Sequence, residues 1–159
     1  SKHAFVATGI TEDYNSLIAL RSSRVNPDDI ESLVNSFILF TKEIISRYGF
    51  VDSIYADSAE QVLIKTLQKA LLDNNLNIKV RNSIKNEIVD RIRIVNRLIS
   101  EGRFFILEDT ESLQEALVTA TWDSKKLDTE RLDDGTSDID SLDAFEYSFE
   151  KYIKALGWR

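Results

Sequence analysis

The sequence predicts a single α/β domain, and three observations support this fold class. Short apolar runs of strand length alternate with longer segments in which apolar residues recur at helical spacing. The 159 residues are enough for one domain with one core, and Pro27 is the only proline, so no proline-rich linker divides the chain. Two strand-like runs come first, before the alternation begins. A sheet that starts with an antiparallel hairpin and is covered by helices follows from this order.

The first two runs, residues 3–9 and 17–21, are separated by a polar stretch, which is typical of a β-hairpin. A helix is expected to begin next. Asn26 is the predicted N-cap and Pro27 the first helical residue, because proline lacks only an N–H that has no partner there. Apolar residues then recur at helical spacing as far as Gly49, which we expect to end this helix.

The later elements alternate strand and helix. Strands are predicted over residues 51–55, 78–80 and 103–107, and helices over residues 59–73, 84–102 and 110–121. Residues 122–136 combine many charges with weak periodicity and predict a loop or an irregular hairpin. A last helix is expected over residues 137–156.

Composition excludes several classes of function. The chain has no cysteine, so disulfides, thiolate zinc sites and cysteine nucleophiles are ruled out. No apolar run approaches the roughly 20 residues of a membrane span. The net charge of −7 argues against a large basic DNA-binding surface. Methionine is absent even from position 1, so we expect the sequence to be a piece of a longer chain.

Asp57 is the first candidate functional residue. It directly follows the predicted strand 51–55 and precedes a helix, which puts it at a strand tip. One interpretation is a helix N-cap, since Asp is a good helix starter. The other is a metal ligand, because binding sites in α/β sheets gather beyond the carboxyl ends of the strands.

Asp138, Asp140 and Asp143 form the second group of acids. Acids near a helix N-terminus are favoured by the helix dipole, and this explanation suits Asp138 best. It suits Asp143 poorly, because Asp143 lies inside the predicted helix and is followed by Ala144 and Phe145. A buried carboxylate is costly unless it is paired or binds a metal. Asp140 and Asp143 are three residues apart and share one helix face.

Carboxylates from a strand end and a helix are what a hard divalent cation needs, namely oxygen ligands held at fixed distances. The two groups of acids therefore indicate metal-dependent phosphodiester hydrolysis. Lys85, predicted near the start of a helix, is either a solvated lysine or a group that approaches a phosphate. Trp122 is expected to be packed rather than to face DNA. The single histidine, His3, is not expected to be catalytic, and no glycine-rich phosphate loop is present.

Four stretches together resemble the C-terminal nuclease domain of the large terminase subunit of tailed bacteriophages. They are residues 4–9, residues 54–60 around Asp57, the Leu-Gln-Glu of residues 113–115 with the Trp-Asp of residues 122–123, and residues 140–147, which are similar to the helix with the family's last acid. The resemblance implies an RNase H-like fold with a mixed central sheet and helices on both faces. It also implies that residues 1–159 are one nuclease domain whose first strand lies upstream of residue 1.

By the same resemblance, Asp57, Asp140 and Asp143 are catalytic metal ligands for Mg²⁺ or Mn²⁺, with two ions expected. Two ions about 4 Å apart activate a water and stabilise the leaving oxygen. The implied reaction is cleavage of concatemeric double-stranded viral DNA during genome packaging, in the host cell cytoplasm. The implied partners are DNA, an ATPase motor domain in the same full-length chain, the small terminase subunit and the portal, with no membrane.

Two departures from the family pattern matter. The family's first acid lies in an Asp-x-Gly strand that this sequence does not contain, and Asp140 stands where some relatives have His. Other interpretations remain open: a resolvase, transposase or integrase on the same fold, or a non-catalytic acidic module that docks a basic partner.

Overall fold

The computed structural model describes residues 2–119 and 139–157, and it is an α/β domain. The predicted loop 122–136, together with Trp122 and Asp138, lies outside these residues. The strands are β1 (His3–Ile10), β2 (Leu17–Val25), β3 (Ser53–Ala56), β4 (Lys79–Asn82) and β5 (Phe104–Ile106). The helices are α1 (Ile30–Tyr48), α2 (Gln61–Asp73), α3 (Ile88–Ser100), α4 (Glu111–Thr119), α5 (Ile139–Phe149), the 3₁₀ helix η1 (Glu150–Tyr152) and α6 (Ile153–Gly157).

The described strands form two ladders. β1 and β2 are the predicted antiparallel hairpin, and β5 adds to β2 in parallel, so this three-stranded sheet is mixed. β3 and β4 form a separate parallel pair. Within the described residues no ladder joins β1 to β3, so each has a partner strand on one side only.

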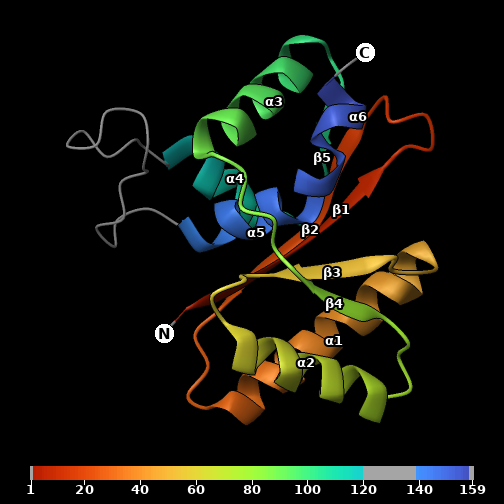
Figure 1. The fold of residues 1–159 in the computed structure, drawn as a ribbon, viewed down its shortest axis with the longest axis vertical. Helices are drawn as coiled ribbons and strands as arrows, with labels where there is room; N and C mark the ends of the chain where they lie inside the picture. Colours follow the sequence, from red (N-terminus) through yellow and green to blue (C-terminus); the bar gives the residue numbers. More distant parts are fainter. Residues whose placement is uncertain (1, 120–138, 158–159) are drawn as a thin grey trace.

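Helices cover both sides of the strands (Figure 1). α1 and α2 lie on one side, where they enclose a core with β3 and β4 that includes Phe37, Leu67, Leu71 and Val80. The other four α-helices lie on the opposite side, over β1, β2 and β5. Their core includes Leu98, Leu113, Phe145, Phe149 and Leu156. The strands therefore separate two apolar cores.

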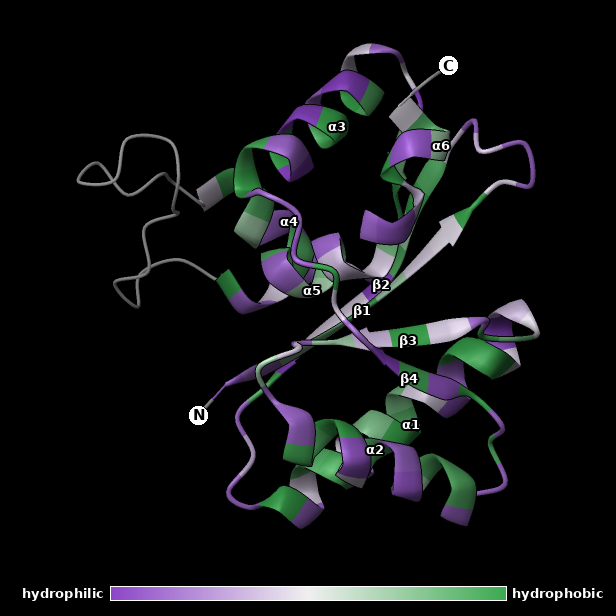
Figure 2. Cartoon of the chain, viewed as in Figure 1, coloured by the Kyte–Doolittle hydropathy of each residue, from purple (hydrophilic) through white to green (hydrophobic). Residues whose placement is uncertain are grey.

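Amphipathic patterning explains where the helices pack. Figure 2 shows hydrophilic and hydrophobic residues alternating around α3, whose buried side includes Ile94, Val95 and Leu98. Among the helices of the described residues, none is long and apolar enough to cross a membrane.

Three local predictions are wrong. Helix α1 begins at Ile30, and its N-cap is Asp29 rather than Asn26, because a side-chain oxygen of Asp29 accepts a hydrogen bond from the N–H of Ser32 at 2.7 Å. Helix α3 begins at Ile88, so Lys85 lies in the preceding loop. The predicted last helix is not continuous, because η1 interrupts it after Phe149.

Candidate metal-binding site

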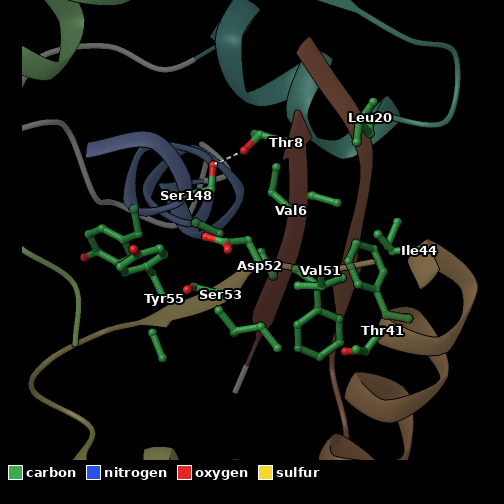
Figure 3. A pocket seen from close by; sticks show the side chains of 18 of the residues that line it. Val6, Thr8, Leu20, Thr41, Ile44, Val51, Asp52, Ser53, Tyr55 and Ser148 are labelled. Atoms are coloured by element: carbon green, nitrogen blue, oxygen red, sulfur yellow. Dashed lines mark hydrogen bonds between the residues drawn. The ribbon is translucent and has the colours of Figure 1, made fainter. Parts of the chain in front are cut away.

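A cavity of about 1070 Å³ lies between β1 and β3 (Figure 3). The two strands line it along their lengths. α1 contributes apolar side chains such as Phe37 and Phe40, and α5 contributes Tyr147 and Ser148. The hydroxyl of Thr8 on β1 donates a hydrogen bond to that of Ser148 at 3.0 Å, which ties α5 to the strand. The cavity is thus closed above and below by helices and at its sides by two strand edges.

Asp57 stands where the sequence predicted it, directly after β3, and it lines this cavity. Its Oδ1 accepts a hydrogen bond from the N–H of Ala59 at 3.0 Å. It is not the N-cap of α2, because that helix begins at Gln61 after Glu60. Glu60, which the sequence analysis did not single out, also lines the cavity.

Asp140 and Asp143 lie on α5 and line the same cavity. The helix buries Leu142 and Phe145 in the core, so the side chains between these positions are directed to the cavity side. Asp140 is near the helix start and forms an ion pair with Arg24 at 3.4 Å, with both side chains partly exposed. Asp143 is half-buried, and its Oδ1 lies 3.9 Å from Nη1 of Arg91.

Tyr147 shows that Asp57 and Asp143 act on one region. Burial raises the pKa of its phenol, and the negative charges of Asp143 and then Asp57 raise that pKa further. A phenolate beside two carboxylates would be repelled, so Tyr147 remains neutral at physiological pH. Strand β3 and helix α5, which carry these two aspartates, also contact each other directly.

Lys85 provides the cation that Asp57 binds in this structure. Its Nζ lies 2.6 Å from Asp57 Oδ1, and both side chains are about two-fifths exposed. Burial raises the pKa of Asp57, but the hydrogen bonds from Lys85 and Ala59 and the charge of Lys85 outweigh it. The pKa of Asp57 therefore lies below its usual value, and the carboxylate is charged at neutral pH.

The donor set fits a divalent metal ion in its chemistry and is incomplete in number. Carboxylate oxygens suit Mg²⁺ and Mn²⁺, and the Lys85 ammonium shows that Asp57 accepts a cation. Across residues 2–119 and 139–157, however, no three acidic or histidine side chains are grouped closely enough to hold a metal ion. Asp57, Asp140 and Asp143 thus share a cavity without forming a complete cage.

A buried charged cluster behind the cavity was missed by the sequence analysis. Arg91 on α3 lies between two buried acids: its Nη1 is 3.2 Å from Glu146 Oε1, and its Nε is 3.6 Å from Glu150 Oε1. The Arg91 guanidinium also lies 5.8 Å from the centre of the Tyr147 ring. The i, i+4 spacing of the two acids on a helix was the available signal, but Arg91 is remote in sequence and gave none.

Comparisons with known proteins were informative for structures alone. No protein-family model matches the chain, and no curated protein matches it in sequence. The nuclease domain of the large terminase of bacteriophage SPP1, a structure with bound Mn, aligns with a TM-score of 0.63 at 18% identity, over 93% of this chain and 77% of that one. The nuclease domain of the large terminase of Thermus phage P74-26 aligns with a TM-score of 0.54 at 13% identity, over 95% and 80%. The chain has the RNase H-like fold of the large-terminase nuclease domains.

A large terminase of a thermophilic bacteriophage shows how this fold is placed in a longer protein. It aligns with a TM-score of 0.68 at 14% identity and covers 98% of this chain. The present chain spans 36% of the length of that terminase. The comparison therefore concerns one part of a longer protein, and at this identity it establishes the fold alone.

Proposed function

We propose that this chain is the nuclease domain of a phage large terminase and that it cleaves concatemeric double-stranded viral DNA during genome packaging, in the host cytoplasm. One observation carries the proposal: Asp57 after β3 and Asp143 on α5 line one cavity in a fold shared with terminase nuclease domains. A strand end and a helix brought together in this way supply oxygen ligands from two rigid elements.

The proposed cofactor is Mg²⁺ or Mn²⁺, as two ions held by Asp57 and Asp143 with Asp140 as an auxiliary ligand. The bound Mn of the SPP1 domain supports this choice of metal class. When bound, such ions supply charge stabilisation and lower the pKa of a water. The chain's own contribution is orientation: the Ala59 N–H fixes the Asp57 carboxylate, and the buried face of α5 fixes the helix that carries Asp143.

An additional strand between β1 and β3 would complete the site. Each of these strands, as described, has one unpaired edge, and the cavity lies between those edges with helices above and below. A strand joined to β1 by a tight hairpin would run antiparallel to it and end beside the start of β1. Arg24, the ladder partner of Ala4, meets Asp140 at that end. An acid at the end of the added strand would thus approach the other carboxylates, as the resemblance implies for the family's first acid.

The proposed partners are double-stranded DNA and, in the full-length protein, an ATPase motor domain, the small terminase subunit and the portal. The net charge of −7 indicates that grip on DNA depends on bound metal, on local basic groups or on these other parts.

The experiment that tests the proposal is cleavage of supercoiled plasmid with Mg²⁺ or Mn²⁺, using the chain with and without an N-terminal hairpin strand that ends in Asp. The extended chain should linearise and degrade the plasmid with little sequence preference, and Asp143→Asn should abolish this without unfolding the protein. Asp73→Asn is the matched control, because Asp73 is exposed at the end of α2 and pairs with Lys69. Nicking or joining at specific sites would instead support a resolvase or transposase. No gain of cleavage on extension would contradict the proposal, and activity unaffected by Asp143→Asn would place catalysis elsewhere.

A further inference from the structure

The loop between β4 and α3 is held in an unusual conformation. Lys85 lies in the left-handed region with φ of 57°, which is uncommon for a residue other than glycine, asparagine or aspartate. At the start of this loop the N–H of Ser83 donates to the carbonyl of Ala56, the last residue of β3, at 2.8 Å. The hydroxyl of Ser83 accepts a hydrogen bond from the N–H of Ser58 at 3.0 Å. The loop is therefore fastened to both sides of Asp57.

Glu150 fastens the other end of this loop. Its two carboxylate oxygens accept hydrogen bonds from consecutive backbone groups, the N–H of Lys85 at 3.1 Å and the N–H of Asn86 at 2.9 Å. Glu150 is 3% exposed, and the guanidinium of Arg91 beside it compensates its charge. A buried carboxylate with two backbone donors and a cation is a strong anchor. It keeps Lys85 in a conformation that an unanchored residue of this kind would rarely adopt.

We propose that Glu150 is a positioning residue that holds the Lys85 ammonium on Asp57, so that a divalent cation must displace Lys85 to reach that carboxylate. This inference rests on the proposed function, because it concerns the metal ligand Asp57. Glu150 is not among the cavity-lining residues, whereas Asp57 is. Glu150 therefore acts on the site through the loop and Lys85.

The exposure of the ion pair makes displacement feasible. Lys85 and Asp57 are each about two-fifths exposed, and ion pairs with this access to water are weak. Their removal should tighten cation binding by about two- to fivefold, which is the range that such pairs are worth. The pair thus keeps the carboxylate neutralised in the absence of metal and yields when a divalent ion arrives.

The test is calorimetric titration of the protein with Mn²⁺, comparing the unmodified chain with Lys85→Met, Glu150→Gln and the double variant. Both single variants should bind Mn²⁺ about two- to fivefold more tightly. Glu150→Gln removes a negative charge, so a simple field effect would weaken Mn²⁺ binding, and the two explanations differ in sign. In the Lys85→Met background, Glu150→Gln should add no further tightening, because the lysine it releases is already gone.

Glu146→Gln is the matched control. Glu146 is an equally buried acid that pairs with the same Arg91, but the loop N–H groups of Lys85 and Asn86 donate to Glu150. This variant should not tighten Mn²⁺ binding. Amide hydrogen exchange gives a second readout that needs no metal: Glu150→Gln should speed exchange at Lys85 and Asn86, whereas Lys85→Met should leave exchange at Asn86 unchanged.

Two outcomes separate the inference from the proposed function. If Mn²⁺ binding depends on Asp57 and neither Lys85→Met nor Glu150→Gln tightens it, the positioning role is wrong and the metal site stands. If the unmodified chain shows no Mn²⁺ binding that Asp57→Asn removes, the proposed metal site itself fails. Unchanged amide exchange in a folded Glu150→Gln variant would also overturn the anchoring role.

Discussion

Asp57, at the end of β3, and Asp143, on α5, line the same cavity although most of the described chain separates them in sequence. The charges of both raise the pKa of the Tyr147 phenol that lies near them. Their proximity results from packing: α5 lies against β1 and contacts β3, so the helix face carrying Asp143 is turned toward the end of β3. This relationship is the physical basis of the proposed metal site.

Metal binding should stabilise the folded chain if these two carboxylates share a cation. A ligand that binds only the folded state raises the free energy of unfolding by about 2.7 kcal/mol at one hundred times its Kd. We therefore expect Mn²⁺ to raise the Tm of the unmodified chain, measured by calorimetry. Asp57→Asn and Asp143→Asn should each abolish most of that increase, because each removes a charged oxygen ligand.

Asp140→Asn provides the graded comparison for this experiment. Asp140 pairs with Arg24 at 3.4 Å and lies nearer the helix start. Its loss should reduce the Mn²⁺-induced increase in Tm without abolishing it. An increase of the same size in all three variants would show that Mn²⁺ binds elsewhere.

Local sequence signals were sufficient to place the two principal acids on their elements. The apolar run before Asp57 predicted a strand end, and the buried residues on either side of Asp143 predicted a helix with one face in the core. Both features depend on short-range periodicity, which a single sequence displays. The alternation of strands and helices predicted the α/β class for the same reason.

The contacts that surround these acids were not predictable in this way. Glu150 points inward because the last helix is interrupted by η1, whereas the sequence predicted a continuous helix there. Its partners, the N–H groups of Lys85 and Asn86, lie in a loop that the sequence assigned to a helix. Ile84, which the helical periodicity included, is 53% exposed. Contacts between segments far apart in sequence depend on tertiary packing, which local patterns do not encode.

The pKa of Asp57 should rise when its cationic partner is removed. In the native chain the hydrogen bond and charge of Lys85 contribute to a pKa below the usual value. A carboxyl group with a depressed folded-state pKa adds stability above its unfolded pKa of about 3.9, and this stability is lost as pH falls through the folded-state value. Lys85→Met should therefore move the Asp57 titration to higher pH and reduce the loss of stability in acid.

The titration can be followed by the ¹³C resonance of the Asp57 carboxyl group. Lys79→Met is a suitable control, since Lys79 is an exposed lysine at the start of β4. The control should leave the Asp57 pKa unchanged. A pKa that does not move in Lys85→Met would show that the ion pair does not form in solution.

Arg91 should be essential to stability because it compensates two buried acids. Glu146 and Glu150 are 1% and 3% exposed, and Arg91 lies beside both. Breaking a buried ion pair by removing one partner typically costs about 3–5 kcal/mol. Arg91→Met should lower the free energy of unfolding at pH 7 by this amount, measured by urea denaturation. Arg93→Met, an exposed arginine on the same helix, should change it by less than about 0.5 kcal/mol.

The helix that carries Asp143 should depend on Phe145 for its attachment to the sheet. Phe145 is fully buried, and its ring centre lies 5.0 Å from that of Phe149 and 5.7 Å from that of Phe104 on β5. Replacing a buried phenylalanine with alanine removes apolar burial and leaves a cavity, at a cost of about 3–5 kcal/mol. Phe145→Ala should lower the free energy of unfolding by this amount. Phe50→Ala, the same change at a side chain that is 75% exposed, should cost far less. Equal effects of the two substitutions would show that α5 is not held by this core.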